Sequence, residues 1–261
     1  MKKIALTIAV LFIHLVILGC APNSTRTDEE MGGLSQDPKA PSAADVYVKM
    51  SIAYLQQGKI DIALIKIKRG LELDPTSADA NNIIALIYER LGELDLAEQH
   101  YKKALDLNSN DPYILNAYGS FLCTQGKYQK ANLHFMAALK NALYPTPEVA
   151  LTNAGICSAR QGDLDQAETY YRQALRANSK FPTALQQMAK LSVEKKNYLS
   201  ARGYLQRYLE VGQYSAETLW LGIRIERELG DLDTLASYEL LLRAKFPDSE
   251  EMRMFEESKR R

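Results

Sequence analysis

The chain has 261 residues, of which 46% are hydrophobic and 25% charged, a balance typical of a folded globular protein and not of a disordered one. Its 32 Lys and Arg residues equal its 32 Asp and Glu residues in number, so the net charge is zero. Proteins that bind nucleic acid usually carry an excess of positive charge, so we expect no nucleic-acid partner. The length allows one or two domains.

Residues 1–19 differ in character from the rest of the chain. Lys2 and Lys3 precede an uncharged, largely apolar run over 4–18, which is followed by a glycine and Cys20. A short basic region, an apolar region of about this length and small residues at its end are typical of a secretory signal peptide. The run is too short to span a membrane comfortably. The sequence therefore predicts that residues 1–19 are removed.

The letters LVILGC that end at Cys20 resemble the lipobox of bacterial lipoproteins, although Leu18 stands where that motif usually has a small residue. This resemblance implies that Cys20 is acylated and becomes the first mature residue; a plain secreted protein is the alternative. By resemblance to Gram-negative lipoproteins, Ala21 implies the outer membrane. Each buried methylene contributes about 0.8 kcal/mol, so several acyl chains anchor a protein stably.

Residues 20–43 contain the predicted lipidated cysteine and a linker. The segment is rich in Pro, Gly, Ser and Thr and has few large apolar side chains. A flexible coil of this length has an end-to-end distance of about 25 Å. The linker is therefore expected to hold the folded part of the protein just off the membrane.

After the linker the sequence repeats with a period of 34 residues. Five alanines, spaced 34, 34, 36 and 34 residues apart, share this period with five glycines; they are Ala63, Ala97, Ala131, Ala167 and Ala201, with Gly58, Gly92, Gly126, Gly162 and Gly230. This length and pattern resemble the tetratricopeptide repeat, in which small residues let two helices, A and B, approach. The phase predicts an all-α, right-handed solenoid with 12 or 13 helices and a concave groove lined by the A helices.

Six predicted repeats account for the chain from residue 44 to residue 249. They are 44–77, 78–111, 112–147, 148–181, 182–215 and 216–249, and the third has two extra residues around Tyr144. In each repeat the glycine is expected to end helix A in a left-handed conformation. The fifth repeat lacks it and has Asn197 near that place. Residues 250–261 predict a polar capping helix, with Met252, Met254 and Phe255 available for docking.

Two histidines and two cysteines invite a metal-site interpretation that their spacing does not support. His100 and His134 fall at equivalent positions of successive repeats, about 10 Å apart, too far to share one zinc ion, and are predicted to be ordinary surface residues. Cys123 and Cys157 lie on the A helices of neighbouring repeats. We interpret them as small packing residues, with a disulfide as the open alternative in an oxidising compartment.

The sequence offers no basis for catalysis. It contains no Gly-rich phosphate loop and none of the motifs GxSxG, HExxH or CxxC. Its paired carboxylates, Glu29 with Glu30 and Glu256 with Glu257, lie in the linker and the tail, where solvation is the simpler explanation. We therefore predict no enzyme activity, no cofactor, no metal and no small-molecule substrate.

The remaining candidate site is the concave groove, the surface with which such solenoids usually bind peptides. The side chains expected to line it are Val48, Ile52, Leu55, Asn82, Leu86, Tyr113, Asn116 and Ser120. Those of the first repeat form an apolar patch suited to a partner helix or strand, unless the linker folds back and covers them. Asn82 and Asn116 also resemble the asparagines of chaperone-type carboxylate clamps, but of the cations such clamps use only Arg90 is near.

Three longer stretches carry a closer resemblance: ILNAYGSFLCTQGKYQKA at 114–131, LYP at 143–145 and LWLGIRIERELGDLDTLASY at 219–238. With the lipobox, the linker and the six repeats, they make the whole chain similar to the type IV pilus biogenesis and stability lipoproteins of the PilF/PilW type, which are secretin pilotins. The resemblance implies a non-enzymatic lipoprotein on the periplasmic face of the outer membrane. Its implied partners are pilus secretin subunits, whose localisation and multimerisation it promotes. A general periplasmic scaffold for envelope assembly and a regulator of an envelope enzyme are the alternatives.

Overall fold

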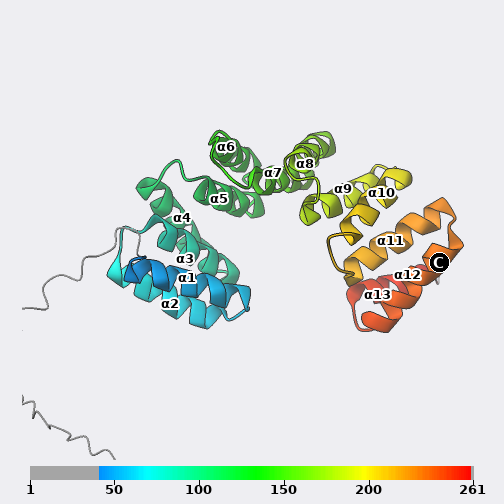
Figure 1. Cartoon of the computed structure of the whole chain (residues 1–261), viewed down its shortest axis with the longest axis horizontal. Coiled ribbons are helices and arrows are strands. Elements are labelled where there is room, and N and C mark those ends of the chain that lie inside the picture. Colours follow the sequence, from blue (N-terminus) through cyan, green and yellow to red (C-terminus); the bar gives the residue numbers. More distant parts are fainter. Residues whose placement is uncertain (1–40, 260–261) are drawn as a thin grey trace, which may run out of the picture. The chain divides into compact units, whose positions relative to one another are not determined.

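The computed structural model describes residues 41–259, and these residues form thirteen helices and no strand (Figure 1). In chain order the helices are α1 (Ala43–Gln56), α2 (Ile60–Leu73), α3 (Ala78–Leu91), α4 (Leu94–Leu107), α5 (Pro112–Thr124), α6 (Tyr128–Leu139), α7 (Pro147–Gln161), α8 (Leu164–Ala177), α9 (Pro182–Glu194), α10 (Tyr198–Leu209), α11 (Ala216–Leu229), α12 (Leu232–Lys245) and α13 (Glu250–Lys259). Within the described residues no helix combines the length and the apolar character that crossing a bilayer requires. The predicted signal peptide, Cys20 and most of the linker lie outside the described residues.

Consecutive helices pack as antiparallel pairs that follow one another along the chain. Each odd-numbered helix contacts the even-numbered helix after it, and α1, α3, α5, α7, α9, α11 and α13 also contact one another in succession. Such nearest-neighbour packing defines an α-solenoid, so the predicted fold class and helix number are confirmed. Four A helices begin at the first residue of their predicted repeats, and α1 and α7 begin one residue earlier.

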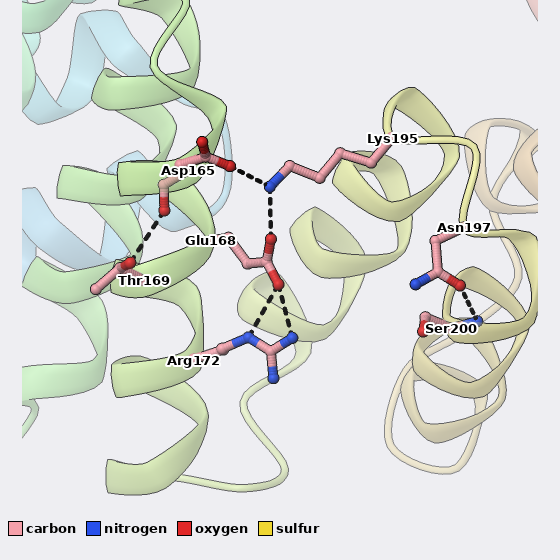
Figure 2. Close-up of polar contacts among 7 residues, drawn as sticks. All are labelled: Asp165, Glu168, Thr169, Arg172, Lys195, Asn197 and Ser200. Atoms are coloured by element: carbon pink, nitrogen blue, oxygen red, sulfur yellow. Dashed lines mark hydrogen bonds and ion pairs between the residues drawn. The ribbon is translucent and has the colours of Figure 1, made fainter.

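The turn between the two helices of a repeat is made by a residue with positive φ. The five glycines expected there have φ between 72° and 92°, a range in which a Cβ atom causes strain. In the fifth repeat, where the sequence has no glycine, Lys196 takes this place with φ 58°. Asn197 caps α10, because its Oδ1 accepts a hydrogen bond of 3.3 Å from the Ser200 N–H (Figure 2).

Small side chains mark the place where helices A and B meet. The five periodic alanines have no exposed area, and large rings such as those of Tyr101 and Phe135 fill the space beside them. At Gly119 of α5 an added Cβ atom would lie only 2.8 Å from the Phe135 ring of α6, and at Gly155 of α7 it would lie still closer to the Tyr171 ring of α8. Gly203 of α10 differs, since nothing lies within 4 Å of its added Cβ atom.

This contrast predicts opposite effects of the same substitution. Gly119→Ala should lower the free energy of unfolding by about 1–3 kcal/mol, because the new methyl group pushes Phe135 away. Gly203→Ala should raise it by about 0.5–1 kcal/mol, since Ala forms helix better than Gly and meets no obstacle. Urea denaturation of both variants tests the pair. Equal effects of the two substitutions would show that the close contact at Gly119 does not constrain the repeat.

Cys123 of α5 and Cys157 of α7 form a disulfide bond between the third and fourth repeats. Their Cα atoms lie 5.7 Å apart, within the range that a disulfide requires, and each residue is only 4% exposed. Our preferred interpretation of these cysteines as unpaired packing residues is therefore wrong, and the disulfide alternative is correct. The reason is that successive A helices come closer at these positions than the sequence spacing reveals.

The last helix, α13, covers the end of the sixth repeat. Phe255 has no exposed area and meets the Trp220 ring edge-on, with the ring centroids 6.4 Å apart. Met252 is half-buried and packs against the same cluster. Met254 is 41% exposed and, contrary to our expectation, does not take part in this docking. The capping helix therefore closes the apolar end of the array mainly through one aromatic side chain.

An ion-pair pattern recurs at two repeat junctions. Glu98 of α4 accepts hydrogen bonds from Lys102, one turn later, and from Lys127 of the next repeat, at 2.9 and 3.0 Å. Glu168 of α8 likewise binds Arg172 one turn later and Lys195 of the next repeat (Figure 2). The hydrogen bonds from Lys102 and then Lys127 lower the pKa of Glu98 from 4.5 to about 2. Each carboxylate therefore links two repeats.

The lowered pKa of Glu98 predicts a defined pH dependence. Since the folded-state pKa lies below the unfolded one, the ionised carboxylate stabilises the fold above about pH 4.5 and this contribution disappears as the pH falls towards about 2. The free energy of unfolding of Glu98→Gln should therefore fall less between about pH 5 and pH 2 than that of the original chain. The control is Glu93→Gln, because Glu93 makes no ion pair among the described residues. Identical pH profiles for the two variants would contradict the assignment.

Candidate partner-binding surface

The candidate surface lies on α1, α3 and α5, and side-chain caps fix the start of each of these helices. The Ser42 and Ser77 hydroxyls each accept a backbone N–H at 3.1 Å, and the Asp111 carboxylate accepts the Tyr113 N–H at 2.8 Å. An N-cap defines which residue begins the helix and hence which side chains share one face. The caps therefore set the register of the A helices that carry the predicted groove residues.

Two of the predicted groove residues belong to the core of the first two repeats. Val48 and Leu55 are each 6% exposed and lie in a cluster with Ile67 of α2 and Ile84 of α3. The prediction that they form an open apolar patch is therefore wrong. The next helices of the array cover them, because α1 buries this side against both α2 and α3.

Ile52 and Leu86 line the edge of this core and remain half-buried. Asn82 lies on α3, one turn before Leu86, and is also half-buried. Its Oδ1 atom is buried and has no hydrogen-bond partner among the described residues. A buried acceptor without a donor is uncommon in folded proteins and costs free energy. Ile52, Asn82 and Leu86 thus combine apolar area with an unused hydrogen-bond acceptor.

Tyr113 is the open side chain of the predicted set, with 50% of its surface exposed. Its ring packs edge-on against Tyr144, which is buried and comes from the LYP insertion of the third repeat, with centroids 5.3 Å apart. Because this contact holds the ring, Tyr113 presents a fixed aromatic surface to solvent. The two extra residues of the third repeat therefore have a structural consequence on the A-helix face.

Asn116 and Ser120 already have partners inside the array. The Asn116 Oδ1 atom accepts a hydrogen bond of 3.0 Å from Asn153 of α7, and the Ser120 hydroxyl donates to the Asn116 carbonyl, also at 3.0 Å. Arg90, the cation nearest to a carboxylate clamp, donates to the Leu55 carbonyl at 3.4 Å. Asn116 and Arg90 are thus engaged within the array, and the clamp resemblance gains no support.

The N-terminal edge of the candidate surface is acidic. Burial, followed by the negative charges of Asp111 and Asp45, raises the pKa of Asp79 above its usual value. Asp45, Asp79 and Asp111 lie at the starts of α1, α3 and α5, so negative charge gathers at one edge of the surface. The negative electrostatic potential at this edge favours a partner segment that carries Lys or Arg.

His100 and His134 are half-buried, and their rings pack against neighbouring aromatic rings. The Nδ1 atom of His100 lies 3.0 Å from the Asn81 Oδ1 atom, and its ring stacks on Tyr88. The ring of His134 meets that of Tyr118 edge-on at 4.9 Å, and burial lowers the pKa of both histidines. In the part of the chain that the structure describes, no group of three or more His, Cys, Asp or Glu side chains could hold a metal ion.

A cavity on the A-helix face of the last repeats was missed as a site. It has a volume of about 320 Å³ and is lined by Lys190, Glu194, Glu217, Trp220, Leu221, Arg224, Glu251 and Met254 of α9, α11 and α13. Trp220 is the single tryptophan of the chain and falls at a groove position of its repeat, which was a usable signal. The contribution of α13 was not predictable, because the repeat period does not fix how a cap docks.

Known proteins resemble this chain both in the sequence of its repeats and in the sequence of nearly the whole chain. The tetratricopeptide repeat family model matches residues 48–112 and 122–185, and a second model of the same repeat matches 100–131. The chain is 32% identical over 254 residues to the type IV pilus assembly protein PilF of Pseudomonas aeruginosa. That alignment covers 97% of this chain and 100% of PilF.

Solved structures extend this likeness to the fold. The P. aeruginosa PilF structure has a TM-score of 0.72 and 34% identity, covering 82% of this chain and 97% of the PilF chain. The structure of PilW, a type IV pilus biogenesis factor, has a TM-score of 0.74 and 31% identity, covering 83% of this chain and 99% of the PilW chain. The Cut9–Hcn1 assembly, at 18% identity and a TM-score of 0.68, shares the fold alone.

The identity to PilF extends over all of that relative and over nearly all of this chain. The repeats, the thirteen helices and the two pilus-protein structures agree with it. The chain therefore belongs to the family of type IV pilus biogenesis tetratricopeptide-repeat proteins that includes PilF and PilW.

Proposed function

We propose that this protein is a non-enzymatic outer-membrane lipoprotein that binds pilus secretin subunits and promotes their localisation and multimerisation. Its family membership supports a role in pilus biogenesis. The observation that carries the binding proposal is the surface made by α1, α3 and α5, where Tyr113 packs against Tyr144 and is still 50% exposed. Side chains of this kind suit a polypeptide partner.

The surface offers two kinds of contact to one partner segment. Tyr113, Ile52 and Leu86 provide apolar area. The acidic edge at Asp79 would attract a basic side chain. An apolar segment of a secretin subunit would thus be shielded from aggregation while it is carried to the membrane.

The proposed anchor is the acylated Cys20 that the lipobox resemblance implies. After removal of residues 1–19, the linker would join Cys20 to α1, which begins at Ala43. A flexible linker of this length spans about 25 Å, so the repeats would remain close to the periplasmic face of the outer membrane. The anchor would determine where the partner is delivered, and the repeats would hold it.

A substitution on the A-helix face tests the binding proposal. The double variant Ile52→Ser with Tyr113→Ser should remove most heat-resistant secretin multimers and piliation, because central interface side chains of this type contribute about 2 kcal/mol each. Secretin multimers are measured on gels from cells that express each variant at equal level.

The matched control is Ile65→Ser with Leu133→Ser, two side chains that are 65% and 70% exposed on the B helices α2 and α6. This control should leave secretin multimers unchanged. If the A-face variant keeps its thermal midpoint and still supports normal multimers, the surface on α1, α3 and α5 is not the secretin site.

The anchor has a separate test in Cys20→Ser. This variant should give a folded, soluble protein with an unchanged thermal midpoint, since Cys20 lies outside the repeats, while secretin subunits fail to reach the outer membrane. Membrane fractionation measures both proteins. A variant that still sediments with the outer membrane would refute lipidation of Cys20 as the anchor.

The periplasmic scaffold remains the second candidate, and one observation favours it. The cavity around Trp220 is separate from the surface on α1, α3 and α5, so the array could hold two partners at once. Pull-down from cells without secretin distinguishes the two functions, because only a scaffold retains defined envelope partners there.

A further inference from the structure

The B helices of the fourth and fifth repeats line an open, basic surface cavity that the proposed function does not use. The cavity, of about 370 Å³, lies between α8 and α10 and is lined by Thr169, Arg172, Leu175, Arg176, Tyr204 and Arg207. Three of the six lining side chains are arginines and none is acidic. A chain with zero net charge thus concentrates positive charge at one place.

Arg172 is held in position and still has free donors. Its Nε and Nη2 atoms both donate to one oxygen of Glu168, at 3.0 and 2.6 Å, and the third nitrogen points away from that carboxylate (Figure 2). Lys195 binds the other oxygen of Glu168 at 2.7 Å. Lys195 also binds the Asp165 Oδ1 atom at 2.6 Å, so two cations here balance two carboxylates, and what this corner offers to a ligand is the free nitrogen of Arg172 (Figure 2).

Arg207 and Arg176 provide the other two guanidinium groups. Arg207 donates from Nη2 to the Ser179 carbonyl at 2.8 Å, and its guanidinium carbon lies 5.6 Å from the centre of the Tyr204 ring. These contacts orient Arg207 and leave its other nitrogens available. Arg176 is exposed and makes no hydrogen bond or ion pair among residues 41–259. Unlike the other two arginines, it has no structural role in the array.

The repeat does not require this charge. At the equivalent positions each of the other four junctions has at most two cations, and three of the four also have a carboxylate. The sets are Lys68, Glu72 and Lys103; Lys102, Asp106 and Ala137; Met136, Lys140 and Gln173; and Gln206, Glu210 and Leu241. Three cations without a carboxylate occur only where the fourth and fifth repeats meet. Packing of the repeats therefore does not explain why three arginines occur at this junction.

We propose that this cavity binds a phosphate group, carried by a free phosphate compound or by a phospholipid headgroup. The planar guanidinium fork matches phosphate oxygens and remains charged at any physiological pH. One guanidinium satisfies a carboxylate, as Arg172 does for Glu168, whereas three suit an anion with several acceptor oxygens. Leu175 and Tyr204 provide an apolar wall for the carbon atoms of a phosphate ester.

The test uses the full chain in micelles of an uncharged detergent. Binding of inorganic phosphate and of glycerol 3-phosphate is measured by calorimetry, and the same protein is then placed in micelles that contain phosphatidylglycerol or, as the zwitterionic comparison, phosphatidylcholine. The variant is Arg176→Gln with Arg207→Gln. The control, Lys68→Gln with Lys103→Gln, removes the same charge from exposed positions at another junction.

The arginine variant should bind about tenfold more weakly, and the control should stay within about twofold of the original chain. Binding of both soluble phosphates supports a free-phosphate ligand, whereas dependence on phosphatidylglycerol alone supports a lipid headgroup. Equal losses in the two variants, or no binding of any phosphate probe, would overturn the site. A poly-glutamate peptide that binds in an arginine-dependent way while the phosphates do not would assign the cavity to an acidic protein segment instead. Equal thermal midpoints exclude misfolding, and none of these outcomes bears on the surface of α1, α3 and α5.

Discussion

The structure depends on the close contact of helices A and B at small side chains. The periodic alanines have no exposed area, and at Gly119 not even a methyl group fits against Phe135. Because this contact fixes the distance between the two helices, the rings beside it can fill the remaining space without voids. Each repeat then exposes an apolar edge that only the next repeat can cover. A helical pair with little stability of its own thus becomes a continuous array.

This arrangement leaves two surfaces free for different tasks. The A helices carry Tyr113 and the acidic edge, whereas the B helices carry most of the ion pairs that link repeats. The carboxylates of Glu98 and Glu168 each bind one cation of their own helix and one of the next repeat. Arg176 has no such partner among residues 41–259, and three arginines meet between α8 and α10, which is why we single out this place as a site.

The repeat period was sufficient to predict the helix pairs and most of their first residues. It also predicted the left-handed glycines, because each feature is local and recurs in phase. Contacts between different repeats were harder to predict from the sequence. Val48 and Leu55 were misplaced because helix periodicity does not reveal that α2 and α3 both cover this side of α1. The pairing of Cys123 with Cys157 depends on a distance between A helices that no single repeat encodes. Lys196 was missed because its conformation is imposed by the turn against its own preference.

The disulfide between α5 and α7 has a consequence for how the array opens. A solenoid held by nearest-neighbour contacts can lose its terminal repeats one at a time, since each junction opens nearly independently. A covalent bond between the third and fourth repeats resists such progressive opening from either end. The repeats that carry the candidate surface and those that carry the basic cavity are therefore joined even when a terminal repeat is briefly open. In a compartment that keeps this bond oxidised, the terminal repeats can open locally to accommodate a partner while the third and fourth repeats stay joined.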